Sequence, residues 1–280
     1  MKLRILHRTE YRYALPVRNN SNELRVTPID NPRQRTILHL VRVLPAVMMR
    51  RYQDLYHNKV SFFEVEETHK SLIFDVSSVV ETKPTPFEAI PADTLFAALA
   101  ESEIKDSFQP FLLADGPVQI TPQIWRTAID IKAECKEVLP VVQGLLEFVH
   151  QTCQYVPGAT TLSTSTEEFF GKPQGVCQDF AHLLLALCRA IGIPARYACG
   201  YVYDQKRGAV LGGHASHAWC EVWIPGFGWV GLDPTNHRFI DEAYVASAIG
   251  RDYRDTTPVR GSYWGTADRE MRVTVHVEAK

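Results

Sequence analysis

Apolar and polar residues alternate in short runs over the first 82 residues. Runs with period-two or β-branched character cover residues 4–13, 36–44, 60–67 and 71–81, and turn-forming residues lie between them. This alternation indicates strands buried on one face, and strands in series without helices pair in antiparallel fashion. We therefore expect residues 1–82 to form an antiparallel β-sandwich-like domain.

The pattern changes after a proline-rich stretch. Residues 83–94 contain three prolines and predict a linker, and beyond them apolar residues recur at helical spacing. Helices are expected over residues 123–139 and 140–153, and again from Cys177 up to Gly192.

The rest of the chain combines strands with one more helix. Strand character returns in four runs, at residues 195–203, 217–224, 229–233 and 269–279. Residues 241–249 predict a short helix. Helices followed by a group of strands indicate an α+β fold, so we expect residues 95–280 to form a second domain with helices packed on an antiparallel sheet.

Composition limits the classes of function. The chain has 280 residues, with 30 Lys and Arg against 32 Asp and Glu and no long basic run, so neither nucleic acid nor a membrane is an expected partner. The basic N-terminal residues are not followed by the apolar segment of a secretory signal, and no run reaches the ~18 apolar residues of a membrane helix. We expect a cytoplasmic protein whose six cysteines are reduced thiols.

Cys177 differs from the other cysteines in its position. It precedes Gln178 and Asp179 and stands where an unbroken apolar helix begins. A helix N-terminus carries about half a unit of positive charge and free N–H groups, which stabilise a thiolate and can also hold an oxyanion. Cys177 is therefore the candidate nucleophile, and Asp179 is expected to cap the helix or pair with its dipole.

A thiol nucleophile needs a base, and His217 is the best-placed histidine. In the strand of residues 217–224, every second residue from His217 to Trp223 is aromatic or polar, while the residues between them are small and apolar. Because alternate residues point to opposite faces, the apolar face is expected to be core. His214 lies in a glycine-rich loop that does not fix it, and His182 is expected to pack within its helix.

Asp233 ends the next strand and is the candidate acid that holds the imidazole in one tautomer. Its position depends on the register of the two strands. If Trp223 pairs with Trp229 across a five-residue connection, Asp233 becomes a diagonal neighbour of His217, ~7–8 Å away between backbone centres. A four-residue turn would place Asp233 on the other face. We expect the first register, through a five-residue connection or a bulge, although Asp-Pro is also a common turn opener.

Two other chemistries fit the residues less well. His217 and Cys220 have zinc-ligand side chains, but a strand turns them to opposite faces, and the chain has no Cys-x-x-Cys pair. The Gly-x-Ser-x-Gly elbow of serine hydrolases is absent. No metal and no cofactor are expected.

Three stretches resemble the bacterial transglutaminase-like family: GVCQDFAHLL at 175–184, HAWCEVWIPGFGWVGLDPT at 217–235 and GRDYRDTTPVRG at 250–261. The opening LHRTEYRYALPVRNNSNELRVTP, at residues 6–28, is similar to the N-terminal region that precedes the core in that family. Together these stretches extend over most of the chain.

The resemblance implies a papain-like core with an N-terminal β-sandwich, and a Cys–His–Asp triad that falls on Cys177, His217 and Asp233. It also implies thioester chemistry, in which the thiol attacks a carboxamide, ammonia or an amine leaves, and the acyl group passes to an amine or to water.

The chain departs from animal transglutaminases in ways that limit what carries over. It lacks their Gly-Gln-Cys-Trp stretch, with Val176 before the thiol, and it is shorter, without an evident Asp/Glu-rich calcium loop. Calcium dependence and cross-linking are therefore not carried over. Gln174 and Tyr155 are the weak candidates for an oxyanion partner beyond the Cys177 backbone.

The predicted function is thiol-dependent acyl transfer or hydrolysis at amide bonds of a peptide or protein substrate. One alternative is a cysteine peptidase or amidase with water as the acceptor. Another is a catalytically silent interaction protein that keeps the fold.

Overall fold

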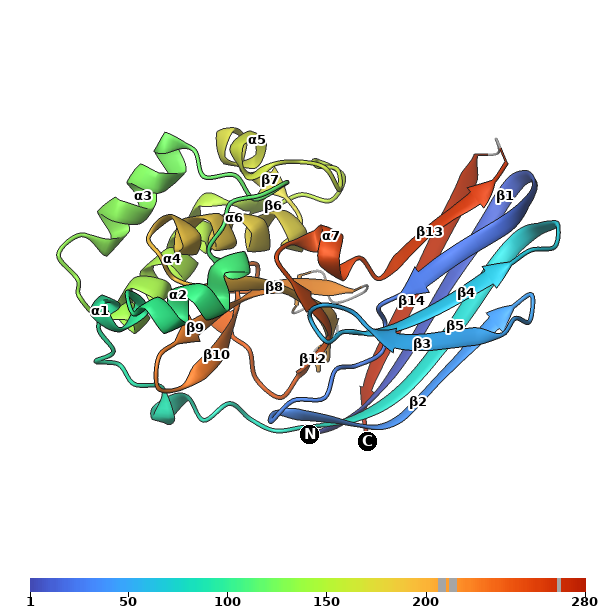
Figure 1. Cartoon of the computed structure of the whole chain (residues 1–280), viewed down its shortest axis with the longest axis horizontal. Helices are drawn as coiled ribbons and strands as arrows, with labels where there is room; N and C mark the ends of the chain where they lie inside the picture. The colour runs from blue at the N-terminus through green and yellow to red at the C-terminus, as the bar shows by residue number, and fades with distance from the viewer. Residues whose placement is uncertain (206–209, 212–215, 266–267) are drawn as a thin grey trace.

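The computed structural model describes residues 1–205, 210–211, 216–265 and 268–280, and the chain folds into two parts (Figure 1). One part is built from strands and contains both chain ends. The other combines helices with a smaller sheet. This is the α+β class that the sequence predicts.

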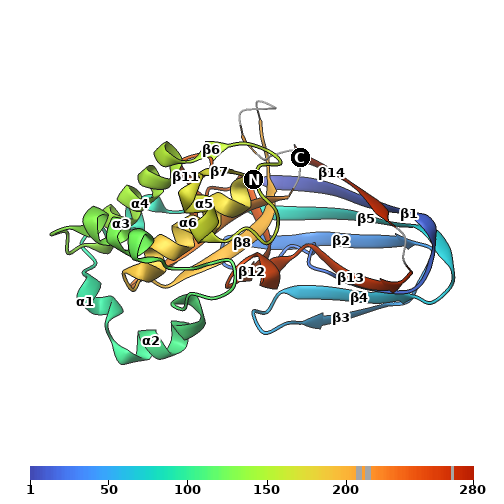
Figure 2. The ribbon, with the colours of Figure 1, turned by 90° about the horizontal axis from the view of Figure 1, so that it is seen from above.

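The first part is a curled antiparallel sheet. Its seven strands are β1 (Lys2–Leu24), β2 (Gln34–Leu44), β3 (Met49–Gln53), β4 (Lys59–Val65), β5 (His69–Thr82), β13 (Val259–Trp264) and β14 (Arg269–Ala279). The first half of β1 pairs with β5 and β14, and its last residues pair with β4 and β13. The register shifts between these halves, where Asn19 has a φ of 48°. The long strand thus bends from one layer into the other (Figure 2).

The two layers of this sheet enclose their own core. Tyr11, Leu72 and Phe74 from one layer pack with Phe63 and Val65 from the other, and all five are almost fully buried. Each belongs to one of the alternating runs in the sequence. The sandwich-like arrangement expected for the N-terminal region is therefore confirmed.

The C-terminal strands require a correction to the predicted domain organisation. Residues 259–279 are predicted to belong to the second domain, 95–280, but β13 and β14 both pair with β1. Alternation identifies a strand without identifying its partner, and here the partner is more than 230 residues away in the chain. Val275 and Val277 of β14 pack against a buried cluster that includes Leu3 of β1. The boundaries of 1–82 for a first folding unit and 83–94 for a linker stay predictions.

The second part holds all the helices formed by the described residues. Its helical elements are η1 (Phe87–Ala89), α1 (Phe96–Leu99), α2 (Ser102–Phe108), η2 (Gln109–Phe111), α3 (Pro122–Lys132), α4 (Val138–Thr152), α5 (Thr166–Gly171), α6 (Cys177–Ala190) and α7 (Tyr253–Thr256). Its strands are β6 (Gln154–Tyr155), β7 (Gln174–Gly175), β8 (Ala195–Val202), β9 (His217–Ile224), β10 (Gly228–Asp233), β11 (Arg238–Phe239) and β12 (Tyr244–Gly250). β6 and β7 form a short parallel pair, and the other five form a sheet in the order β11-β10-β9-β8-β12.

α6 is the central helix of this part. It contacts β9 on one side and α3, α4 and α5 on others, and Leu183 to Leu187 are fully buried. A helix that is apolar on all sides is stable only when it is covered on all sides, which explains the unbroken apolar run. None of the helices formed by the described residues is long and apolar enough to cross a bilayer. The predicted cytoplasmic location stays a prediction.

Two helix predictions need correction. The helix expected over residues 123–139 ends at Lys132, where Ala133 takes a φ of 40°. Residues 241–249, predicted as a helix, contain most of strand β12. Pairing with β8 decides this conformation, and β8 lies about 40 residues earlier in the chain, so the local sequence does not show the pairing.

Gly200 of β8 shows how closely β12 approaches. A Cβ at this position would lie 1.9 Å from the carbonyl oxygen of Val245. We therefore expect Gly200→Ala to lower the free energy of unfolding by about 1–3 kcal/mol, the cost of overpacking a filled site. Urea denaturation followed by circular dichroism measures this. Gly171→Ala is the matched control, because a Cβ there meets nothing within 4 Å. Equal midpoints for the two variants would contradict the steric explanation.

Side-chain amides from the first part cover the edge of β12. Asn58 donates to the carbonyl of Ile249 at 2.7 Å and accepts from its N–H at 2.8 Å. Gln34 makes the same pair of bonds with Ala246, at 2.8 and 2.9 Å. An amide side chain offers one donor and one acceptor direction, so it satisfies an edge residue in the way a neighbouring strand would.

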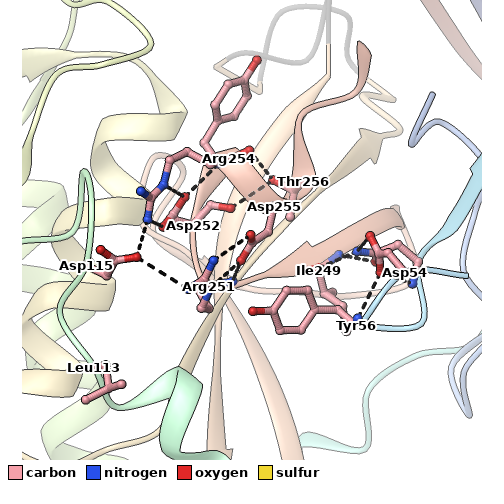
Figure 3. Close-up of polar contacts among 12 residues, drawn as sticks. Asp54, Tyr56, Leu113, Asp115, Ile249, Arg251, Asp252, Arg254, Asp255 and Thr256 are labelled. Carbon is pink, nitrogen blue, oxygen red and sulfur yellow. Dashed lines mark hydrogen bonds and ion pairs between the residues drawn. The ribbon is translucent and has the colours of Figure 1, made fainter. Parts of the chain in front are cut away.

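The stretch of residues 250–258 adds an ionic network at the same junction (Figure 3). Arg251 donates to both carboxylate oxygens of Asp255, at 2.8 and 3.1 Å. Arg254 donates to Asp252 at 2.8 Å and to Asp115 at 2.7 Å. These bonds hold the single turn of α7 between the helical layer and the first sheet. They give a structural role to a motif that the sequence analysis leaves without one.

Candidate active site

Cys177 is the first residue of α6, as the sequence predicts. The residue before it, Val176, has extended backbone, and its N–H donates to Oδ2 of Asp179 at 2.8 Å. The expected capping role of Asp179 is therefore confirmed. Thr160 donates to the same oxygen at 2.6 Å. Gly175 is required beside them, because a Cβ at that position would lie 2.4 Å from Asp179 Oδ2.

His217 is the first residue of β9 and is almost fully buried. The predicted division of this strand into two faces is confirmed. Cys220 and Val222 lie in the core cluster that includes α6, whereas Trp219 packs with Tyr244 in a separate cluster. The ring centroids of His217 and Trp219 are 6.4 Å apart.

The register of β9 and β10 is the one expected for a triad. Trp229 pairs with Trp223, and the ladder continues to Leu232 opposite Cys220. Asp233 comes next along the strand, on the face of His217. Ile224 and Gly228 also pair, so the turn between the strands contains three residues and not the predicted five.

The side chains of His217 and Asp233 form a buried pair. Nε2 of His217 lies 2.7 Å from Oδ2 of Asp233, and neither side chain is exposed. Burial acts to lower the pKa of His217, but the charge and the hydrogen bond of Asp233, with a further contribution from Cys177, raise it to about 10. Burial acts to raise the pKa of Asp233, but His217 and the other donors outweigh it, so this pKa is lowered. The pair is therefore imidazolium and carboxylate at neutral pH.

Cys177 is the second side chain that acts on the imidazole. Nδ1 of His217 is buried and has no hydrogen-bond partner among the described residues. Cys177 is nonetheless one of the two groups whose hydrogen bonding and charge raise the pKa of His217. The fold thus brings the three predicted residues together, with the carboxylate at Nε2 and the thiol as the polar neighbour left for Nδ1.

Two residues that the sequence analysis missed complete the surroundings of Asp233. The hydroxyl of Tyr244 and Nδ2 of Asn236 donate to its Oδ2, at 2.7 and 2.8 Å. The backbone N–H groups of Thr235 and Asn236 donate to Oδ1, at 3.0 and 3.1 Å. Asp233 therefore also opens the turn that its Asp-Pro sequence suggested. The Asp-Pro-Thr-Asn sequence could have indicated Asn236, but only the fold brings Tyr244 to this carboxylate.

Tyr244→Phe is expected to slow alkylation of Cys177 by iodoacetamide about tenfold, because it removes one charge-assisted hydrogen bond that orients Asp233. Loss of this donor also raises the pKa of Asp233, so the acidic limb of the pH–rate profile should move to higher pH. A series of alkylation rates against pH measures both effects. Tyr201→Phe is the matched control, since it removes a buried hydroxyl that bonds to His7 at 2.9 Å and not to Asp233. Equal profiles for the two variants would leave Tyr244 with a packing role alone.

Of the other histidines considered in the sequence, only His182 lies among the described residues. His182 accepts from the backbone N–H of Tyr253 at 3.2 Å, and burial lowers its pKa to about 4, as fits a packing residue. His214 lies outside the described residues.

The two oxyanion candidates differ in their surroundings. Burial raises the pKa of Tyr155, and the charge of Cys177 raises it further, so its hydroxyl lies within electrostatic reach of the thiol. Gln174 donates instead to the side chain of Gln154, at 3.2 Å in an exposed position. Tyr155 is thus the candidate on which the thiol acts, and the oxyanion role stays a prediction.

The candidate metal ligands are otherwise engaged. His217 bonds to Asp233, and Cys220 lies in the core. In the part of the chain that the structure describes, no three His, Cys, Asp or Glu side chains group as a metal site would require. All six cysteines are free thiols.

Comparisons with known proteins agree with this geometry. Residues 126–234 match the model of the transglutaminase-like superfamily, and residues 3–81 match the bacterial transglutaminase-like N-terminal region. An uncharacterized protein of Mycobacterium leprae is 35% identical over 281 residues, which is 99% of this chain and 98% of that protein. The chain belongs to the transglutaminase-like superfamily.

Two similar proteins have names that refer to different reactions, a transferase and a protease. A protein-glutamine gamma-glutamyltransferase of Pseudomonas aeruginosa is 29% identical over 126 residues, which cover 42% of this chain and 19% of that protein. A crystal structure from Cytophaga hutchinsonii, of a candidate cysteine protease, superposes with a TM-score of 0.78 at 23% identity and covers 100% of this chain and 91% of that one. The second match shows that the two-part fold is shared over the full length.

Proposed function

We propose that this protein is an enzyme of thiol-dependent acyl chemistry at amide bonds of peptide or protein substrates. Cys177 is the nucleophile, His217 the general base and then acid, and Asp233 the residue that orients His217. The single observation that carries this proposal is that the two ring nitrogens of His217 have different surroundings. Nε2 is bonded to a buried carboxylate at 2.7 Å, whereas Nδ1 has no hydrogen-bond partner among the described residues and is left for the thiol that begins α6.

The first half of the reaction forms a thioester. Nδ1 of His217 takes the thiol proton of Cys177, because the buried charge of Asp233 stabilises the imidazolium that forms. The sulfur attacks the carbonyl carbon of the amide, and the carbonyl oxygen takes the negative charge. Free N–H groups at the start of α6 are positioned to stabilise that oxyanion. Nδ1–H then protonates the leaving nitrogen, the C–N bond breaks, and ammonia or an amine departs.

The second half transfers the acyl group. Neutral His217 takes a proton from an incoming amine or water, which attacks the thioester carbon. The C–S bond breaks, and the sulfur returns to its pairing with the imidazolium. Asp233 remains ionised throughout and keeps the Nε2 proton in place.

The paired thiolate gives a direct test. At mildly acidic pH, His217 with its pKa raised to about 10 is fully charged and stabilises a thiolate beside it. Iodoacetamide should therefore label Cys177 at least about tenfold faster than any other cysteine. Cys153 is a useful internal reference, since burial raises its pKa to about 12. Mass spectrometry of tryptic peptides gives the rates, and His217→Ala should remove the preference. Uniform slow labelling of all six thiols would favour a silent interaction protein.

Substrate assays identify the group that accepts the acyl chain. Glutamine-containing peptides are incubated with and without a labelled primary amine, and ammonia release is compared with backbone cleavage. Label incorporation identifies a transferase, ammonia without label a deamidase, and new peptide termini a peptidase. The absence of all three with a reactive Cys177 would direct the search to other amides.

A further inference from the structure

Asp179 is a buried carboxylate two residues after the candidate nucleophile. Its exposed fraction is 2%, and its Oδ2 accepts from the backbone N–H of Val176 at 2.8 Å and from the hydroxyl of Thr160 at 2.6 Å. The N–H of Asp179 in turn donates to the carbonyl of Val176 at 2.9 Å. These two bonds between Val176 and Asp179 close a short ring that contains Cys177, so the position of the thiol depends on where this carboxylate lies.

Neutral donors, and not a cation, hold the carboxylate of Asp179. Burial raises its pKa, and the groups that act against burial are the hydroxyl of Thr160 first and backbone N–H groups after it. Among the described residues, no Lys, Arg or His side chain forms an ion pair with Asp179. The charge of this carboxylate therefore depends on hydrogen bonds, and Thr160 supplies the one that comes from a side chain.

The titratable groups that face Asp179 from other elements are a thiol and a phenol. Cys153 follows α4, and burial together with the charge of Asp179 raises its pKa to about 12. Tyr197 lies in β8, and burial raises its pKa well above the usual value, with Cys177 and Asp179 among the charges that add to the effect. Both groups stay neutral in mildly acidic solution, so a change with pH at this position reports on Asp179 itself.

Thr160 belongs to the connection between β6 and α5, which other bonds hold in place. Val156 at its start donates to the carbonyl of Gly175 at 2.8 Å, two residues before the nucleophile. Within the connection, the N–H of Thr161 donates to the hydroxyl of Thr164 at 2.9 Å. A separate and braced segment of the chain thus brings the hydroxyl to the carboxylate.

We propose that Thr160 is a positioning residue for the acyl chemistry proposed at Cys177, on which this inference rests. Its hydroxyl holds the Asp179 carboxylate against Val176, and the ring of bonds then keeps Cys177 where it meets His217. Protonation of Asp179 replaces a charged acceptor with a neutral one, which binds the same donors about half as strongly. The arrangement is therefore present above the pKa of Asp179 and is lost as the pH falls through it, and loss of the Thr160 donor raises that pKa.

The test follows alkylation of Cys177 by iodoacetamide against pH in the full chain. Thr160→Val replaces the hydroxyl with a methyl group of similar size. We expect rates within about twofold of the parent at neutral pH and about tenfold lower in mildly acidic solution, because the acidic limb moves up by about one pH unit. Thr160→Ser keeps the donor and should restore the parent profile. A packing role alone would lower the urea midpoint of Thr160→Val without moving the acidic limb.

Thr164→Val is the matched control, since the Thr164 hydroxyl accepts from the N–H of Thr161 and not from or to Asp179. It should show the parent profile. Carbon-13 NMR titration of the Asp179 carboxyl is the second measurement, and Thr160→Val should raise its pKa.

The outcomes separate this inference from the proposed function. A reactive Cys177 with the same pH profile in Thr160→Val and the parent, or a pKa of Asp179 that Thr160→Val leaves unchanged, would overturn the role of Thr160 alone. A parent chain in which Cys177 reacts no faster than the other cysteines would contradict the proposed function, and the positioning role would fail with it.

Discussion

Cys177→Ala is expected to abolish turnover of any amide substrate while the chain stays folded. The thiol supplies the bonding electrons for the thioester, and no other described cysteine contacts His217, so no residual route through a second thiol is expected. The fold should tolerate the change because Cys177 is half-buried at the end of α6, and its capping bonds come from Asp179. Loss of activity by at least about 10⁴-fold is expected for removal of a nucleophile.

The control for this prediction is Cys135→Ala. Cys135 is also a half-buried thiol, but its Sγ donates to Glu137. Activity should be unchanged in that variant, and circular dichroism and urea midpoints should be close to those of the parent for both. Turnover that persists in Cys177→Ala would contradict the thiol mechanism, even if the variant folds like the parent.

The sequence predicted the parts of this site that depend on local rules. A glycine before a polar-flanked cysteine and a long apolar run mark a helix N-terminus, and α6 begins at that residue. Alternation in residues 217–224 separates the core face from the face of His217, and the expected pairing of Trp223 with Trp229 follows from a short turn containing Gly226. These predictions succeeded because each rests on neighbours within a few residues.

The predictions that failed depend on distant partners. β12 was expected to be a helix, and its strand conformation comes from pairing with β8 and from the amides of Gln34 and Asn58. The C-terminal strands join β1 for a similar reason. Tyr244 lies 11 residues from Asp233, and no local pattern marks it as a donor. What the sequence could not supply is the order of strands in space.

Asp233→Asn should lower the rate of acyl transfer by about 10⁴-fold, the loss found for the equivalent change in a Ser-His-Asp triad. The carboxylate accepts three hydrogen bonds at Oδ2, from His217, Tyr244 and Asn236. An amide NH₂ at that position would face three donors, and an amide turned around would lose the two backbone N–H bonds at Oδ1. The imidazole must then accept at Nε2 and carry its proton on Nδ1, where it can no longer take one from the thiol.

Asp233→Asn also tests how the charge of Asp233 affects the pKa of His217, apart from how Asp233 orients the ring. Asp233 is the largest influence that raises the pKa of His217, so its loss should bring that pKa down towards the value that burial dictates, below 6.5. The imidazolium would then be lost at neutral pH, and rapid alkylation of Cys177 should be confined to more acidic solution. NMR titration of the imidazole and alkylation rates against pH measure the two effects.

Asp241→Asn is the matched control for Asp233→Asn, because the Asp241 carboxylate accepts from the backbone of Ala243 in a neighbouring turn and makes no bond to His217. It should leave both pH profiles unchanged. Near-full activity in Asp233→Asn would show that Asp233 serves to form its turn and does not take part in the reaction. In that case the buried pair would be a packing feature, and Cys177 and His217 would have to act as a dyad.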